Sequence, residues 1–301
     1  MRKISKVAAI DCGTNSIRLL ISEDGREIIR EMEIVKLGEG VDRTKNFSPI
    51  AVERTLVALR RFKALIDHHK VERVRFCATS ATRDAQNRKI FTEPVESILG
   101  VAPEVIVGIE EARLSFLGAT SELPISDAPF LVVDIGGGST EFVLGERSVQ
   151  SAISVDIGCV RMTERHFTND PPTEQEIAST RFDINRAIDQ VEIEVPISSA
   201  RTLVAVAGTA TTVAAAALKL PTYDREAIHG ARISAERTFE ISNWLLSMDK
   251  NERANLGFMH PGRVEVIAAG ALVLAEILKR TGAREFVASE RDILDGIVAT
   301  F

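Results

Sequence analysis

The chain has 301 residues, of which 45% are hydrophobic and 27% are charged, a composition typical of a globular protein long enough for two domains. Its formal net charge of −6 disfavours nucleic acid as a general partner, because nucleic-acid-binding proteins carry an excess of basic side chains. Neither the N-terminus nor the run at 205–220 is long and apolar enough to enter a membrane, and three cysteines in apolar surroundings fit a reducing compartment. We therefore expect a soluble cytoplasmic protein without a membrane partner.

The first predicted element is a hairpin at 7–21, with the sequence VAAIDCGTNSIRLLI. An apolar run ends at Asp11, a small turn that contains Gly13 follows, and apolar residues resume after Ser16. A buried strand, a tight turn and a return strand explain this pattern. The turn would bring backbone N–H groups close to a ligand.

An amphipathic helix is predicted over 49–69, and a strand over 71–79 follows it. The strand runs into a helix start that contains Ser80 and Arg83. Free N–H groups at such a start bind anions, and Arg83 is placed to reach the same anion. A hydroxyl cap with a solvated arginine explains these residues equally well.

A further strand is predicted over 104–109, and Glu110 and Glu111 open the helix after it. Acids in a first helical turn are ordinary partners of the helix dipole, although this corner would also be a rigid mount for a base. The polar segment 121–129, which contains prolines, predicts a domain boundary. We place the N-terminal domain at 1–122 and the C-terminal domain at 123–301, with the terminal helix 291–301 able to pack back on the first.

A second hairpin, LVVDIGGGSTEFVL at 131–144, repeats the first one 123 positions later. Asp134 corresponds to Asp11, and Ser139 corresponds to Ser16. Amides and hydroxyls suit phosphate oxygens while carboxylates suit a cation, so each hairpin suits a metal–phosphate complex. Two copies of one hairpin predict two similar half-molecules.

The remaining chain alternates strands and helices. Strands are predicted at 153–156, 201–207 and 285–289, and helices at 158–165, from a capping box at 173–176, at 239–246, at 264–278 and at 292–300. After the strand at 201–207, the segment Gly208–Thr212 opens an Ala-rich helix and is a third candidate phosphate site, although ordinary capping explains it as well. The whole indicates an α/β fold with mixed sheets.

Together these motifs resemble the exopolyphosphatase and guanosine pentaphosphate phosphohydrolase (Ppx/GppA) family. The matching stretches are AIDCGTNSIRLL (9–20), ATSATRDAQN (78–87), GIEEARLSFLGA (108–119), VVDIGGGSTEFVL (132–144) and VAGTATTVAA (206–215). The resemblance implies an α/β protein of two ribonuclease-H-like domains, of the actin, sugar-kinase and heat-shock-protein ATPase superfold, with a cleft between them. The length corresponds to the short two-domain form of the family.

The resemblance also implies residue roles. Glu111 would be the general base that activates the attacking water. Mg²⁺, or Mn²⁺ in its place, would be positioned by Asp11, Asp134 and Glu141. The phosphates would be held by Gly13, Thr14, Asn15, Ser16, Ser80, Arg83, Gly136, Gly137, Gly138 and Ser139, with Gly208, Thr209 and Thr211 near a leaving-group phosphate. We expect some of Arg18, Arg83, Arg88, Lys89, Arg161 and Arg232 to line a basic channel.

The predicted function is an exopolyphosphatase, which hydrolyses the terminal phosphoanhydride of inorganic polyphosphate. Guanosine pentaphosphate is an alternative substrate that the motifs do not separate from polyphosphate. A kinase of the same superfold, or a nucleotide-binding sensor or scaffold, are further alternatives. The resemblance implies a homodimer, for which the apolar helix at 264–278 is weak additional support.

Overall fold

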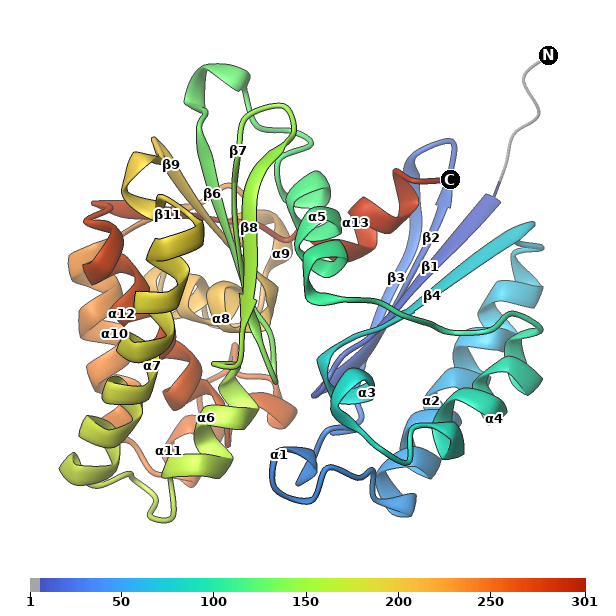
Figure 1. The fold of residues 1–301 in the computed structure, drawn as a ribbon, viewed down its shortest axis with the longest axis horizontal. Coiled ribbons are helices and arrows are strands. Elements are labelled where there is room, and N and C mark those ends of the chain that lie inside the picture. Colours follow the sequence, from blue (N-terminus) through green and yellow to red (C-terminus); the bar gives the residue numbers. More distant parts are fainter. Residues whose placement is uncertain (1–5) are drawn as a thin grey trace. The chain divides into compact units, whose positions relative to one another are not determined.

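The computed structural model describes residues 6–301, and contacts divide them into two compact units whose elements are labelled in Figure 1. Unit 1 comprises residues 6–118 together with Ile293–Phe301, and unit 2 comprises Ala119–Asp292. The chain therefore passes from unit 1 to unit 2 and back again. Among the helices of residues 6–301, none is long and apolar enough to cross a membrane.

Unit 1 is built on a five-stranded mixed sheet with the order β3-β2-β1-β4-β5. The first three strands pair antiparallel, and β4 and β5 are added parallel to β1. The strands are β1 (Lys6–Cys12), β2 (Ser16–Glu23), β3 (Arg26–Ile34), β4 (Arg73–Ala78) and β5 (Glu104–Val105).

Helices cover both faces of the unit 1 sheet. Successive residues of a strand point to opposite faces, so neighbouring residues of β1 belong to two different cores. Ala8 and Ile10 of β1 belong to the core formed with α2 (Pro49–His68) and α4 (Lys89–Leu99). Ala9 lies in a second core with residues of α5 (Gly108–Ala119) and α13 (Ile293–Val298). Two short helices, α1 (Val41–Thr44) and α3 (Ser80–Asp84), complete the unit.

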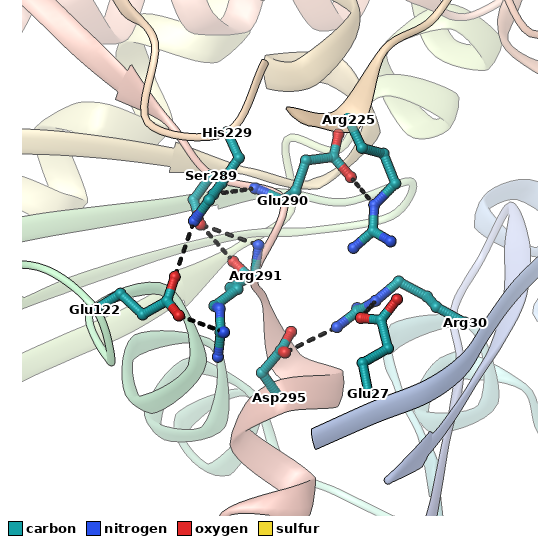
Figure 2. Close-up of polar contacts among 9 residues, drawn as sticks. All are labelled: Glu27, Arg30, Glu122, Arg225, His229, Ser289, Glu290, Arg291 and Asp295. Carbon is teal, nitrogen blue, oxygen red and sulfur yellow. Dashed lines mark hydrogen bonds and ion pairs between the residues drawn. The ribbon is translucent and has the colours of Figure 1, made fainter. Parts of the chain in front are cut away.

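Polar contacts secure the segments where the chain passes between units (Figure 2). Within unit 1, Arg30 of β3 donates to Asp295 of α13 at 2.8 Å and to Glu27 at 2.8 Å. Within unit 2, Glu122 forms an ion pair with Arg291 and is 3.2 Å from Nε2 of His229. Glu122 follows the first passage and Arg291 precedes the second, so one carboxylate ties the two connecting segments together.

Unit 2 repeats the topology of unit 1 with one additional edge strand, in the order β10-β11-β9-β6-β7-β8. Three strands pair antiparallel, β9 and β11 extend the sheet in parallel, and β10 closes it antiparallel. The strands are β6 (Phe130–Ile135), β7 (Thr140–Gly145), β8 (Val149–Val155), β9 (Thr202–Val206), β10 (Arg232–Ser234) and β11 (Glu285–Ala288). The two half-molecules predicted from the repeated hairpin are thus present.

The core of unit 2 is centred on α12 (Ile267–Thr281), which is buried along most of its length and packs with residues of the other helices in one hydrophobic cluster. Burial within its own unit explains its apolar character, so this helix no longer supports a dimer. The predicted capping box of Thr173 and Glu176 is confirmed at the start of α7. The other helices are α6 (Cys159–His166), α7 (Glu174–Glu194), α8 (Ala207–Ala217), α9 (Arg225–Ile228), α10 (Ala235–Ser247) and α11 (Lys250–Ala254).

One predicted strand is wrong. The alternating segment at 104–109 forms a strand only at Glu104–Val105, and α5 begins at Gly108. Val107 and Ile109 produced the alternation, but their side chains are 62% and 55% exposed. The pattern therefore did not mark the buried face of a strand.

Candidate active site

The turn between β1 and β2 directs several of its N–H groups to one side. The N–H of Gly13 donates to the carbonyl of Ser16 at 3.0 Å and closes the turn. The carbonyls of Thr14 and Asn15 accept from the N–H groups of Gly38 and Lys36, at 2.8 and 2.9 Å. In a planar trans peptide the C=O and N–H point in opposite directions. The N–H groups of Asn15 and Ser16 therefore point away from the segment that holds these carbonyls.

The turn between β6 and β7 closes in the same way and presents three such groups. Gly136 donates to the carbonyl of Ser139 at 3.0 Å. The carbonyls of Gly136, Gly137 and Gly138 all accept hydrogen bonds from the start of α6. By the same peptide geometry, the N–H groups of Gly137, Gly138 and Ser139 point away from α6. Three adjacent amides with a common direction form an anion-binding concavity.

Residues at the start of α6 make this arrangement of the second turn possible. A Cβ atom on Gly158 would lie 2.3 Å from the carbonyl carbon and oxygen of Gly137, so only glycine fits there. Arg161 is buried, and its Nε donates to the carbonyl of Gly138 at 2.6 Å. The sequence predicts Arg161 as a candidate for a basic channel, but in this structure its side chain holds the glycine turn. Nothing in the sequence near Arg161 indicates its contact with Gly138.

Unit 2 places two acids beside its turn. Asp134 of β6 and Glu141 of β7 are directly opposite each other in the antiparallel ladder, so their side chains share one face of the sheet. Both residues are buried, with Glu141 only 1% exposed. Oε1 of Glu141 accepts hydrogen bonds from the hydroxyls of Ser139 at 2.7 Å and Ser154 at 2.6 Å.

Unit 1 has a different pair at the equivalent positions. Asp11 lies opposite Arg18 in the ladder of β1 and β2. Nε and Nη2 of Arg18 donate to Oδ2 of Asp11 at 3.0 and 2.7 Å. The aspartate predicted to assist a metal ion is therefore neutralised by an arginine on its own sheet.

Glu110 and Glu111 lie in the first turn of α5 with different surroundings. Glu110 is bound by Arg113 at 2.8 Å, and this hydrogen bond is the main cause that lowers the pKa of Glu110. Glu111 is 8% exposed, and Oε2 of Glu111 accepts from Nη1 of Arg83 at 3.0 Å. The same Nη1 donates to the carbonyl of Ile106 at 2.9 Å, which fixes the arginine.

Ser80, the other predicted phosphate ligand near Arg83, is buried at the start of α3. Its hydroxyl is 3.0 Å from the hydroxyl of Thr14 in the first turn. Unit 1 thus brings the first turn, the start of α3 and the Arg83–Glu111 pair into one connected polar region.

The corner between β9 and α8 is occupied by protein contacts. Ala207 has a φ of +65°, a left-handed conformation that is strained for a residue with a Cβ atom. Arg263 donates to the carbonyl of Gly208 at 3.0 Å and to the hydroxyl of Thr212 at 3.1 Å. This arginine was missed in the sequence, where an isolated basic residue 55 positions from Gly208 gives no signal of the contact.

The two threonines predicted at this corner are interior residues. Thr209 is 4% exposed, and a Cβ atom on Gly270 would lie 2.6 Å from its hydroxyl oxygen. Thr211 is also buried. Both side chains therefore lie in the interior of unit 2.

Other basic candidates are dispersed. Arg88 and Lys89 lie at the start of α4 in unit 1. Arg232 begins β10 and binds Glu285 at 2.7 Å and Asp127 at 3.2 Å. Arg232 lies at the end of the unit 2 sheet where β6 begins, whereas Asp134 lies near the other end of that strand.

The described residues hold no group of three or more histidine, cysteine, aspartate or glutamate side chains positioned for a metal ion. Unit 2 instead offers a pair of buried carboxylates, Asp134 and Glu141. This donor set fits Mg²⁺, which binds proteins through one or two carboxylates and completes its shell with water and substrate phosphates. Carboxylates that can hold a metal ion and amides fixed in one direction are groups that phosphoryl-transfer sites use.

The chain is similar in sequence and in structure to several known proteins. Exopolyphosphatase 2 of Mycobacterium tuberculosis (strain CDC 1551 / Oshkosh) is 47% identical over 311 residues, which cover 98% of both chains. The crystal structure of an exopolyphosphatase-like protein superposes with a TM-score of 0.95 at 46% identity and covers 98% of each chain. An Aquifex aeolicus member of the Ppx/GppA family has a TM-score of 0.81 at 31% identity, over 99% of this chain and 97% of that one.

These two structures confirm the predicted fold of two ribonuclease-H-like units. The model of the Ppx/GppA phosphatase family matches residues 22–300, which is nearly the whole chain. The family match and the full-length similarity to an exopolyphosphatase confirm the predicted class of enzyme, a phosphoanhydride hydrolase. The chain belongs to the Ppx/GppA phosphatase family.

Proposed function

We propose that this protein is an exopolyphosphatase, which removes the terminal phosphate of inorganic polyphosphate in a metal-dependent hydrolysis. The full-length similarity to a protein named exopolyphosphatase 2 supports this substrate. The reaction needs no strong general acid, because the leaving phosphate is weakly basic. Catalysis must then mostly position a water molecule and stabilise charge on the transferred phosphoryl group.

Glu111 is the proposed general base. A general base must be held in a fixed position to accept the proton of the attacking water. The hydrogen bond from Arg83, which is itself fixed by the carbonyl of Ile106, holds the carboxylate of Glu111 in this way. Arg83 is also a forked donor that suits phosphate oxygens, so a bound phosphate would compete with Glu111 for this arginine.

The directed amides are the proposed phosphate ligands. In unit 2 these are the N–H groups of Gly137, Gly138 and Ser139, and in unit 1 those of Asn15 and Ser16. Their carbonyls are already held by α6 and by the segment at 35–38, so the amides are oriented before substrate arrives. Donors fixed in advance stabilise developing negative charge without reorganisation.

Asp134 and Glu141 are the proposed ligands of Mg²⁺ or Mn²⁺. A bound divalent ion would neutralise charge on the phosphate oxygens. The hydroxyls of Ser139 and Ser154 orient Glu141 for this role. Asp11, the third acid predicted to position the ion, is instead compensated by Arg18 within unit 1.

Phosphate release from the purified protein, with and without Mg²⁺, tests this function. Short polyphosphate, long polyphosphate, guanosine pentaphosphate and ATP are compared at equal concentration of chain ends. Glu111→Gln should lower kcat about 10²–10⁴-fold, the usual contribution of a general base. Glu110→Gln is the matched control, because its side chain is bound to Arg113 rather than to Arg83.

The result decides between the alternatives. Metal-dependent release from polyphosphate that disappears in Glu111→Gln and persists in Glu110→Gln supports both the function and the base. A fully active Glu111→Gln variant would remove this residue from the mechanism. Preferential release from guanosine pentaphosphate would assign the alternative substrate, and nucleotide binding without phosphate release would assign a sensor or scaffold.

A further inference from the structure

A cavity of about 450 Å³ opens in unit 2 at the amino ends of the parallel strands β6, β9 and β11. Arg201, Arg232 and Arg284 line this cavity, which we name the arginine pocket. Among the described residues that line it, the one acid is Glu285, which binds Arg232 at 2.7 Å. The lining therefore carries an excess of positive charge in a chain whose net charge is −6.

The strand register places two of these arginines side by side. β9 and β11 pair in parallel, with Val204 beside Val287. Continued back by three residues, this register sets Arg201 beside Arg284, each immediately before its strand. Neighbouring strands are about 4.8 Å apart, and like charges at opposed positions of two strands are destabilising.

No acidic side chain compensates this pair. Arg201 and Arg284 are exposed, and neither has an ion pair or a side-chain hydrogen bond within residues 6–301. Arg232, in contrast, is held by both Glu285 and Asp127. The two free guanidiniums produce a local positive potential that attracts an anion.

The accessible surface of the arginine pocket is polar. Its large apolar side chains are each at most 4% exposed and offer no surface to a ligand; they belong to Leu131, Ile197, Leu203 and Val287. The exposed lining consists of the arginines with Ser198 and Gly282. Such a surface suits a ligand that carries several negative charges and no apolar part.

We propose that the arginine pocket binds the unreacted part of a long polyphosphate chain. This inference rests on the proposed function, in which only the terminal phosphate reacts while every phosphate of the chain carries negative charge. Arg201 and Arg284 bind neighbouring phosphates, since the planar guanidinium matches phosphate oxygens in a two-point contact. Inorganic polyphosphate has no apolar group, in agreement with the lining.

The pocket is distant from the proposed phosphate ligands of unit 2. The N–H of Arg201 donates to the carbonyl of Pro129 at 2.8 Å, just before β6. The glycine turn begins seven residues later at Gly136, about 23 Å away at about 3.3 Å per residue. Only a chain long enough to span this distance occupies both sites, and its second contact raises the apparent affinity through effective concentration.

Phosphate release from short and long polyphosphate, with Mg²⁺ present, tests the proposal. We compare the wild-type protein with the double variant Arg201→Ala/Arg284→Ala. The control is Arg26→Ala/Arg186→Ala, which removes the same charge from two exposed arginines outside the pocket that also have no ion pair among the described residues. The first variant should raise KM for long polyphosphate about 3–30-fold, the effect of two exposed charge contacts. Its kcat and its KM for short polyphosphate should equal those of the wild type and the control.

Amide hydrogen exchange of the wild-type protein without divalent metal measures binding without turnover. Long polyphosphate should protect residues 197–203 and 281–287, and short polyphosphate should not. This measurement decides the proposal even if the double variant fails to fold. Protection of these segments without phosphate release from any polyphosphate would overturn the proposed function and retain the pocket as a polyphosphate site.

Three results would overturn the inference. An equal rise in KM for the two double variants would assign the effect to net charge. A rise that is equal for short and long polyphosphate would assign the arginines to the reacting end of the chain. Long polyphosphate that protects neither segment would exclude the pocket as its binding site.

Discussion

The two hairpins at the start of each unit share their topology and turn, yet their facing side chains differ. Asp11 is opposite Arg18, whereas Asp134 is opposite Glu141. A carboxylate bound to a guanidinium is compensated within its own sheet. Two facing carboxyl groups instead offer oxygen ligands to a divalent cation. The repeated hairpin thus supports two chemistries, with the base Glu111 in unit 1 and the proposed metal ligands in unit 2.

Replacement of the facing residues is the strongest test of this difference. Glu141→Gln should lower kcat/KM at least about 100-fold and raise the Mg²⁺ concentration for half activity, because outer-shell changes alone cost 10–100-fold. Arg18→Gln changes the equivalent position of unit 1 and should leave the Mg²⁺ dependence unchanged. Activity measured over a range of Mg²⁺ concentrations checks both, and an equal shift in the two variants would contradict the assignment.

A glycine packs behind each turn, Gly158 behind the turn of unit 2 and Gly38 behind that of unit 1. Replacing each by alanine should destabilise the protein to a different extent. In Gly158→Ala the new Cβ would meet the backbone of Gly137 at 2.3 Å, whereas in Gly38→Ala it would meet the side chain of Thr14 at 2.3 Å. A side chain can rotate but a backbone must shift, so Gly158→Ala should cost about 1–3 kcal/mol of unfolding free energy and Gly38→Ala less. Denaturant unfolding measures the stabilities. The comparison fails if Gly38→Ala is the more damaging change.

The serine hydroxyls beside the two turns should differ less in their contribution to stability. The Ser154 hydroxyl donates to the carboxylate of Glu141, while the Ser80 hydroxyl meets the neutral hydroxyl of Thr14. Hydrogen bonds to charged groups contribute about 1.5–3 kcal/mol and neutral ones about 0.5–1.5 kcal/mol. Ser154→Ala should therefore lower the unfolding free energy more than Ser80→Ala at neutral pH. Equal losses would contradict this contrast.

The buried thiols give the smallest expected effect. Burial is the main cause that raises the pKa of Cys77 to about 12, and burial followed by the charge of Asp11 raises the pKa of Cys12. A raised pKa means that the folded state keeps a proton that the unfolded state loses above pH 9. Stability is then complete below pH 9 and declines between pH 9 and 12, by about 1 kcal/mol per thiol at pH 10.

Unfolding at pH 8, 9 and 10 measures this decline. Cys77→Ala should flatten it by removing one of the two thiols of unit 1. Cys159→Ala is the counterpart in unit 2, where burial also raises the pKa of the thiol. A decline that neither variant alters would assign the pH dependence to other groups.

Most of the fold could be predicted because its signals are local. Both hairpins, the helix at 49–68 and the capping box at Thr173 follow from apolar periodicity and turn residues within a short window. The strand predicted at 104–109 failed because Val107 and Ile109 alternate while exposed to solvent. Periodicity reports burial only where the apolar residues are in fact buried.

The site contacts could be predicted less well because they join distant residues. Asp134 and Glu141 stood out in the motif, but nothing near Arg161 or Arg263 in sequence indicated that these arginines bind the carbonyls of Gly138 and Gly208. The partner of Asp11 could have been derived, since equal strand lengths about the turn place Arg18 opposite it. Contacts set by strand register are accessible from sequence, and contacts set by helix packing are not.

The return of α13 to unit 1 has a consequence for biosynthesis. Leu114 of α5 and Ala9 of β1 share their core with Ile293 and Ile297, which the ribosome adds only after all of unit 2. Unit 2 is continuous in sequence and can fold as it emerges, while the part of the unit 1 core that α13 completes stays uncovered. During this interval the nascent chain exposes an apolar surface that a chaperone would recognise, and release from the ribosome completes the first unit last.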